Sequence, residues 1–212
     1  MTTKERLQQN GWLIRCGAVP VDLCRAVVAD IKAHLLGGED DPVACPDPYG
    51  MVEMYHYQSM WNVRQHPAVH KVFAELFDGD PLWVSIDRTC CKRPLGLSDK
   101  PYSFVHWDIN VNQRPRPFEV QGLVALTDTD ENMGGFQCLP GLYRDLDEWL
   151  ARQPCGKAQP ALIRDEWQYD EGGLTKPEMK AGDLLIWDSF LPHGNGPNHG
   201  KRTRYAQYVT MS

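Results

Sequence analysis

Apolar residues recur with a helical period in two stretches of the first half of the chain. Between positions 21 and 35, Leu23, Val27 and Ile31 fall on one stripe, which Leu35 extends. Residues 67–77 follow the same rule, with an apolar face made of Val69, Phe73, Leu76 and Phe77. Both stretches predict amphipathic helices that pack one face on a core.

The pattern changes after residue 80. Short segments rich in β-branched and aromatic residues follow one another, separated by Gly, Pro, Asn or Asp, which is typical of strands joined by turns. These segments are "PLWVSIDRTCCK", "PYSFVHW", "PFEVQGLVALTD", "GGFQCLP", "GDLLIWDS" and "RTRYAQYVTM". One further helix is predicted in "LYRDLDEWLAR", and a loop rich in Gly, Pro and Asp is predicted at 37–50.

Helices followed by many strands indicate an α+β fold with a mainly β core. We expect residues 1–80 to be mainly helical and to support a sandwich or barrel formed by residues 81–212. A chain of 212 residues is long enough for one full hydrophobic core and short for two. The sequence therefore predicts a single domain spanning 1–212.

Composition and charge exclude several classes of protein. The chain is 42% hydrophobic and 24% charged, which is ordinary for a globular protein. Its formal net charge of -6 gives no field that attracts nucleic acid or an anionic membrane. No run of about 18 apolar residues exists, and the polar N-terminus lacks the apolar segment of a signal peptide. We expect a cytoplasmic protein without nucleic-acid or membrane partners; the sequence leaves its oligomeric state open.

The cysteines indicate free thiols. Seven is an odd number, no CxxC pair occurs, and several cysteines sit inside apolar runs such as "FQCLP". Buried free thiols in a reducing compartment fit this pattern better than a disulfide framework. The positions are Cys16, Cys24, Cys45, Cys90, Cys91, Cys138 and Cys155.

The stretch "YSFVHWDIN" raises the question of a metal site. A strand sends residues i and i+2 to the same face, so His106 and Asp108 can converge on one point. A His-x-acid pair alone is weak, and a third partner is needed. His193, after the strand in "GDLLIWDS", is that partner. A hairpin centred between Asn198 and His199 would place His193 opposite Arg204.

Two histidines and one carboxylate on one face of an octahedral ion form the facial triad of non-heme Fe(II) oxygenases. A keto acid co-substrate that chelates the iron and carries a second carboxylate also needs a buried cation. Arg204 offers an always charged, planar fork for that carboxylate. The residues thus suit Fe(II) with 2-oxoglutarate and O2.

From about Gly11 onward, the chain resembles the phytanoyl-CoA dioxygenase family of Fe(II)/2-oxoglutarate oxygenases. The resemblance is carried by "VHWD", "ENMGGFQCLPGLYR", "AGDLLIWDSFLPHGNGPN" and "KRTRYA". It implies a double-stranded β-helix, or jelly roll, with flanking helices, metal ligands at His106, Asp108 and His193, and a 2-oxoglutarate anchor at Arg204. Leu142-Tyr143 stands where the family usually has Ser-His, outside the metal set. The chain is also shorter than most relatives, which argues against a long acyl-CoA substrate.

Other polar residues are candidates for contacts around the site. Asn195 could touch the co-substrate or simply form a turn. Gln121 and Arg88 lie in strand-like segments, where they either face solvent or contact 2-oxoglutarate, and Arg88 could instead hold the substrate. Arg202 competes with Arg204 for the carboxylate but is expected at the surface or rim. Lys92 and Arg116 are weaker candidates for an anionic substrate.

Aromatic and remaining histidine residues have ordinary structural interpretations. Five aromatic residues could line a pocket or belong to the core: Tyr55, Tyr57, Trp61, Tyr102 and Trp107. Four further histidines lack an acidic partner at ligand spacing and are expected to be structural or solvated: His56, His66, His70 and His199.

The resulting hypothesis is an Fe(II)- and 2-oxoglutarate-dependent dioxygenase that hydroxylates a small metabolite and releases succinate and CO2. A cupin-like metalloenzyme that does not use 2-oxoglutarate is one alternative, but it leaves Arg204 without a role. A second alternative is a non-catalytic small-molecule binding protein on the same scaffold, but this leaves His106, Asp108 and His193 without a role.

Overall fold

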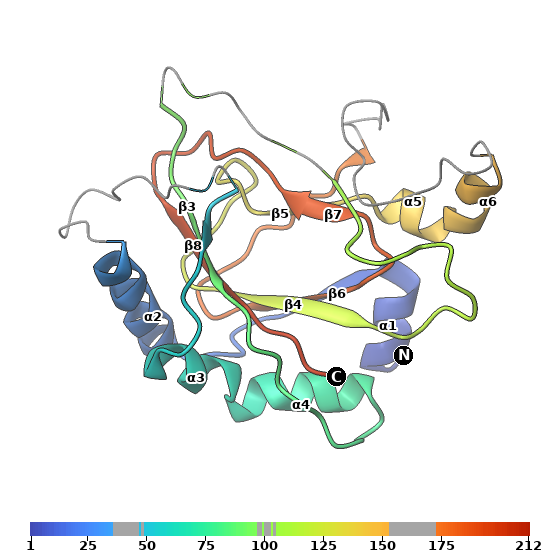
Figure 1. Ribbon diagram of the computed structural model, residues 1–212, viewed down its shortest axis with the longest axis horizontal. Helices are drawn as coiled ribbons and strands as arrows, with labels where there is room; N and C mark the ends of the chain where they lie inside the picture. The colour runs from blue at the N-terminus through green and yellow to red at the C-terminus, as the bar shows by residue number, and fades with distance from the viewer. Residues whose placement is uncertain (36–46, 48, 97–98, 100–102, 104, 153–172) are drawn as a thin grey trace.

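The computed structural model describes residues 1–35, 47, 49–96, 99, 103, 105–152 and 173–212. Its helices are α1 (Thr3–Asn10), α2 (Val21–His34), α3 (Gln58–Arg64), α4 (Pro67–Leu76), α5 (Pro140–Arg144) and α6 (Leu146–Ala151). Its strands are β1 (Trp12–Arg15), β2 (Met51–Val52), β3 (Thr89–Lys92), β4 (Val120–Ala125), β5 (Phe136–Cys138), β6 (Leu184–Asp188), β7 (His193–Asn195) and β8 (Arg204–Tyr208). Figure 1 shows their arrangement.

Two antiparallel sheets form the core. The main sheet has the strand order β1-β6-β4-β8-β3-β2, and β5 pairs with β7 in a second, two-stranded sheet. Apart from β2 and β3, no two adjacent strands of the main sheet have consecutive numbers, which is typical of a wound jelly roll and not of a meander. Helices α2, α3 and α4 lie on one side of the main sheet, and β5 and β7 lie on the other (Figure 1).

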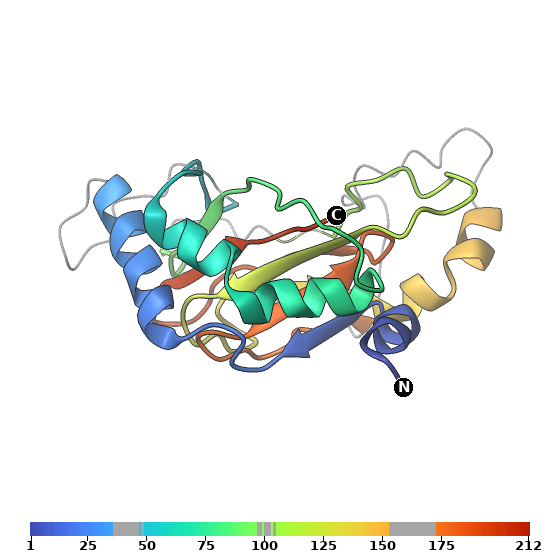
Figure 2. The ribbon, with the colours of Figure 1, turned by 90° about the horizontal axis from the view of Figure 1, so that it is seen from below.

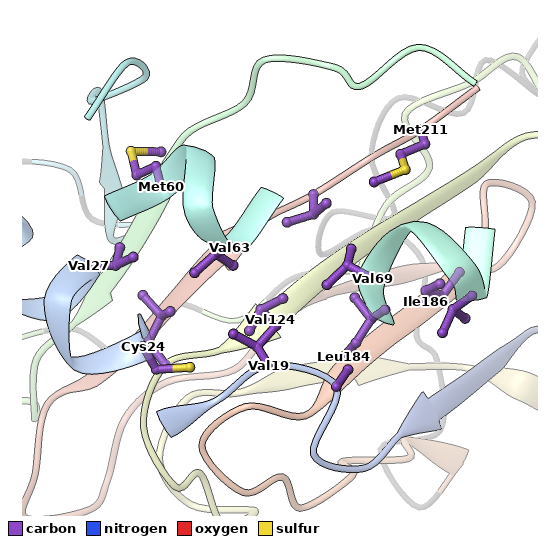
Figure 3. Close-up of a cluster of buried hydrophobic side chains, with 14 of the residues drawn as sticks. Val19, Cys24, Val27, Met60, Val63, Val69, Val124, Leu184, Ile186 and Met211 are labelled. Carbon is purple, nitrogen blue, oxygen red and sulfur yellow. The ribbon is translucent and has the colours of Figure 1, made fainter. Parts of the chain in front are cut away.

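The helical side of the main sheet holds the larger hydrophobic cluster. Residues of β4 alternate, so that Val120 and Val124 face the helices while Leu123 and Ala125 face the small sheet. Buried side chains of α2, α3 and α4 meet those of β4 and β6 there, as Figure 3 shows for Val27, Val63 and Leu184. Seen from the helical side in Figure 2, α3 and α4 lie in front of the sheet. This packing fixes the sheet whose other face carries the site.

The predicted helices at 21–35 and 67–77 are confirmed as α2 and α4. Val27 and Ile31 of α2 are fully buried, as are Phe73 and Leu76 of α4. The helix predicted in "LYRDLDEWLAR" is instead two helices, α5 and α6, which meet at Asp145 with φ -100° and ψ 16°. Strands β3, β4, β5, β6 and β8 lie inside the predicted segments.

The expectation for residues 1–80 left out two strands. β1 pairs with β6 along Trp12–Arg15, and β2 pairs with β3, so both ends of the main sheet come from the N-terminal region. These strands have four and two residues, too few to show an alternating pattern. The predicted loop at 37–50 lies largely outside the described residues.

The predicted hairpin between His193 and Arg204 is wrong. His193 pairs with Cys138 on β5 and forms a bridge with His106, whereas Arg204 on β8 pairs with Lys92 on β3. The two residues therefore belong to different sheets. The predicted hairpin required two strands adjacent in the sequence to pair with each other. In a wound topology, such strands often belong to different sheets.

Two smaller observations concern the thiols and membranes. The described cysteines are free, with Cys16 exposed and the other four, Cys24, Cys90, Cys91 and Cys138, buried. Burial raises the pKa of Cys24 to about 11 and that of Cys138 to about 12, so these thiols stay protonated at neutral pH. Among the described residues, no helix combines the length and apolar character that a membrane crossing needs.

Gly182→Ala is expected to destabilise the fold by about 2–4 kcal/mol. Gly182 precedes β6 with φ +92°, and a Cβ there would lie 2.1 Å from the carbonyl oxygen of Val19. Chemical denaturation measures the loss. Gly79→Ala is the matched control, because Gly79 has φ +85° but no atom within 4 Å of the place that a Cβ would take, so only about 1 kcal/mol should be lost. Equal losses in both variants would show that the contact with Val19 has no effect.

Candidate metal centre

Three side chains from separate segments meet on the face of the main sheet that looks toward β5 and β7. His106 and His193 are joined by two backbone hydrogen bonds, from the His106 amide to the His193 carbonyl at 2.8 Å and in reverse at 3.0 Å. Together with Asp108 they offer ligand atoms that all lie within 4.8 Å of one another. The two-residue spacing of His106 and Asp108 thus brings both side chains to the point where β7 begins at His193.

The distances within this group fit an octahedral ion. His106 Nε2 lies 3.1 Å from Asp108 Oδ1, and His193 Nε2 lies 3.4 Å from Asp108 Oδ2. Two bonds of about 2.1 Å at a right angle separate their ligand atoms by about 3 Å. The side chains of His106, Asp108 and His193 would therefore need only small adjustments to become neighbouring ligands of one metal ion.

The tautomer of His193 also favours a cation. His193 Nδ1 lies 2.9 Å from the carbonyl oxygen of Leu191, which can only accept a hydrogen bond. The ring proton of neutral His193 is therefore on Nδ1, and the lone pair of Nε2 points to Asp108. Two acceptors facing each other need a cation between them, and a backbone carbonyl that orients a histidine in this way is typical of metal sites.

Burial and charge set the protonation states of the group. His193 is 5% exposed, and burial lowers its pKa, so the neutral imidazole is the form present at neutral pH. Burial alone would raise the pKa of Asp108, but its close contacts with the side chains of His106 and His193 hold it well below its usual range. Asp108 is therefore ionised, as a metal ligand must be.

Arg204, at the start of β8, is a buried cation near Asn195 of β7. It is 1% exposed; its Nη1 lies 3.3 Å from Cys90 Sγ and 3.4 Å from Asn195 Oδ1, and its Nε has no hydrogen-bond partner. Within the described part of the chain, no carboxylate lies within 4.0 Å of its guanidinium. A buried charge without a counter-ion is costly, so this position suits an anionic ligand.

A cavity of about 250 Å³ lies at the three proposed metal ligands, and Arg204 is not among the residues that line it. His106, Asp108 and His193 line it together with four other residues that the sequence singled out, Arg88, Lys92, Gln121 and Asn195. Asn195 donates from Nδ2 to the hydroxyl oxygen of Tyr208 at 2.9 Å and so connects Arg204 to the cavity wall. Gln121 points into the cavity, where its amide contacts Asp108.

Several candidates lie elsewhere. Arg202 is exposed as expected and precedes β8, so it does not share that strand with Arg204. Arg116 forms an ion pair with Asp147 at 2.6 Å and lines a different cavity. Among the remaining histidines, His66 caps α4 by accepting from the amide of Ala68, and none lines the cavity around Asp108. The exposed ones are His34, His56, His70 and His199.

The aromatic wall consists of residues other than those predicted. Of the described candidates, none lines the cavity, and Trp107 is core, its indole donating to the carbonyl oxygen of Phe190 at 2.8 Å. Tyr55, Tyr57 and Trp61 also lie away from the cavity. Tyr102 lies outside the described residues. The observed wall contains Tyr49, Phe136, Trp187 and Tyr208. The alternation in "LLIWDS", which puts Trp187 on the face of Leu185, was the signal that could have identified one of them.

The comparisons with known proteins agree with this geometry. The sequence model of the family described as phytanoyl-CoA dioxygenase (PhyH) matches residues 99–206. The Ava biosynthesis cluster protein O of Aspergillus versicolor is 29% identical over 171 residues, covering 74% of this chain and 54% of that protein. The 1-deoxypentalenic acid 11-beta-hydroxylase of Streptomyces exfoliatus is 24% identical over 211 residues, covering 90% and 72%. The chain spans about half the length of the first curated relatives that it matches.

A solved structure shares the fold over nearly the whole chain. The epimerase SnoN, in complex with Fe3+, alpha ketoglutarate and nogalamycin RO, superposes with a TM-score of 0.65 at 16% identity, covering 98% of this chain and 82% of that one. Likeness at this identity shows the fold. The expected double-stranded β-helix with flanking helices is confirmed.

Proposed function

The chain belongs to the phytanoyl-CoA dioxygenase family, and from this premise we propose that it is an Fe(II)- and 2-oxoglutarate-dependent dioxygenase. Its proposed reaction is hydroxylation of an unactivated C–H bond of a small metabolite, with release of succinate and CO2. The observation that carries the proposal is the combination, in one site, of the His106, Asp108 and His193 group with a buried guanidinium that has no carboxylate partner among the described residues.

His106, Asp108 and His193 would hold the iron. When bound, Fe(II) with 2-oxoglutarate and O2 supplies the oxidant for C–H cleavage, which no amino-acid side chain can provide. The chain contributes a neutral imidazole at His193, oriented by Leu191, and an ionised carboxylate at Asp108. Three ligands on one face leave the opposite face for exchangeable ligands.

Arg204 would receive the distal carboxylate of 2-oxoglutarate. Its fork is held by Cys90 and Asn195 and has no competing carboxylate in the described part of the site. Asn195 accepts from Arg204 and donates to Tyr208, so it links the guanidinium to two residues of the cavity wall. Charge-assisted, two-point recognition of a carboxylate is the role for which arginine is best suited.

The substrate would lie on the side of the cavity lined by Tyr49, Asp87 and Arg88. Arg88 is 44% exposed in its side chain and pairs with Asp87 at 3.3 Å, so it is a substrate-facing group and not the buried co-substrate anchor. The cavity of about 250 Å³ lies below the usual range of small-molecule sites, about 300–1,000 Å³, which favours a small substrate over a long acyl-CoA.

Two alternatives fit the site less well. A cupin-like metalloenzyme that does not use 2-oxoglutarate would leave the buried Arg204 without an anion. A non-catalytic binding protein would have no need of three convergent metal-binding side chains beside it. Both alternatives predict that no succinate forms.

A succinate-release screen tests the proposal. The Fe(II)-loaded protein is incubated with 2-oxoglutarate, O2 and members of a small-metabolite library, and succinate is measured with and without each compound. We expect iron-dependent succinate release that a true substrate stimulates, with a product heavier by one oxygen atom. If the protein bound iron but released no succinate, with or without any of the compounds, the cupin-like alternative would be favoured.

Asp108 is also expected to suppress halogenation. Because its carboxylate occupies a coordination position, a halide finds no vacant ligand site. Assays with a substrate in the presence of chloride should give the same hydroxylated product as assays without it, as measured by mass spectrometry. A chlorinated product would contradict the assignment of Asp108 as a ligand.

A further inference from the structure

Gln121 connects a proposed metal ligand to a buried indole. It lies on β4 directly opposite Trp187 of β6, and both side chains point to the face that carries the site. Trp187 Nε1 donates to Gln121 Oε1 at 2.8 Å, and Gln121 Nε2 donates to Asp108 Oδ2 at 2.9 Å. Three side chains from different segments thus form one chain of hydrogen bonds.

The orientation of the Gln121 amide in this chain has one solution. The indole nitrogen of Trp187 can only donate, and the ionised Asp108 can only accept. If the amide were turned around, donor would face donor at Trp187 and acceptor would face acceptor at Asp108. Trp187 is 3% exposed and its ring packs 4.9 Å from that of His193, so its surroundings hold the indole in place.

We propose that Gln121 is a positioning residue that holds Asp108 in a one-oxygen binding mode. This inference rests on the proposed function. The amide donates to Oδ2, which also lies 3.4 Å from His193 Nε2, while Oδ1 lies 3.1 Å from His106 Nε2 and receives no hydrogen bond from the amide. Oδ1 is therefore the oxygen that a metal ion can take without displacing Gln121. Binding through both oxygens would require the carboxylate to turn away from the amide. Gln121 therefore keeps one coordination position open for the keto acid.

Trp187 is part of the same arrangement. Its indole fixes the amide of Gln121 and packs against the ring of His193, so one buried side chain positions two of the three proposed ligands. Partners of metal ligands typically contribute about 10–100-fold to metal affinity. Gln121 is therefore expected to act on metal and keto acid binding more than on folding.

The test is an anaerobic titration of the full chain with Fe(II), followed by 2-oxoglutarate, in wild type, Gln121→Met and Trp187→Phe. The dissociation constant of the metal is measured first, and the visible charge-transfer band of the iron–keto acid chelate then reports co-substrate binding. We expect about 10–100-fold weaker metal binding and a weakened band in Gln121→Met. Trp187→Phe should show a smaller loss in the same direction, because the amide remains but is free to turn.

Gln207→Met is the matched control. Gln207 is a fully buried glutamine on the neighbouring strand β8, whereas Gln121 is partly buried; Gln207 faces the helices and donates to the carbonyl oxygen of Met60. Its loss should lower stability and leave metal affinity within twofold of wild type. Wild-type metal affinity and band in both Gln121→Met and Trp187→Phe would overturn the inference alone. Failure of the wild type itself to bind iron would overturn the proposed function as well.

Discussion

Asp108→Ala is expected to abolish succinate release, with a loss of at least about a thousandfold, because a metal ion contributes several kcal/mol of catalysis. The variant keeps both imidazoles but loses the only carboxylate of the described metal group. The fold should survive, since the side chain of Asp108 is 45% exposed and its removal opens no core cavity. Circular dichroism checks the fold, and coupled detection of succinate checks turnover.

Asp78→Ala controls for the change in charge. Asp78 is an exposed carboxylate that pairs with Lys4, and surface ion pairs contribute little to stability. Its replacement should leave turnover unchanged. Wild-type turnover in Asp108→Ala would show that the ligand assignment is wrong.

Arg204→Met is expected to raise the KM for 2-oxoglutarate about a hundredfold or more, with a smaller effect on kcat. The substitution keeps an apolar stem in a buried position and removes the one cation proposed to meet the distal carboxylate. Loss of one partner of a buried, hydrogen-bonded charge pair costs about 2–5 kcal/mol. Steady-state kinetics at saturating substrate measure the shift.

Arg202→Met is the control, because Arg202 is exposed and lies two residues away. It should leave the KM for 2-oxoglutarate unchanged. If Arg204→Met left the KM unaltered, another cation would have to bind the distal carboxylate. Arg202 would be that cation if Arg202→Met raised the KM instead.

The elements that the sequence predicted are those with local signals. The stripe of Val27 and Ile31 and the apolar face of Phe73 and Leu76 each lie within one helix, so periodicity alone locates α2 and α4. The strands were visible as short β-branched runs. β1 and β2 have too few residues to show an alternation, and only their partners in the sheet define them.

Strand pairing was the part that sequence could not supply. The hairpin argument selected Arg204 because of a supposed pairing with His193, yet Arg204 lies beside Lys92 and reaches Asn195 from the main sheet. The residue is well placed for the proposed role, although the pairing that suggested it does not exist. Non-local pairing depends on the winding of the whole chain, and a count of residues between two strands contains no information about it.

The partners of Gln121 show the same limit. Its place among apolar residues of β4 indicated a buried polar group or a solvent-facing one, and the sequence could not decide between them. Its two partners are Asp108, thirteen positions away, and Trp187, sixty-six positions away. Only the three-dimensional arrangement turns an isolated glutamine into a support for a metal ligand.

The most direct measurement is an anaerobic crystal structure with Fe(II) and 2-oxoglutarate, using anomalous scattering at the iron edge. The account predicts one iron peak bound by His106, Asp108 and His193, with the distal carboxylate of 2-oxoglutarate against Arg204. An iron peak elsewhere, or a keto acid whose distal carboxylate lies away from Arg204, would contradict it.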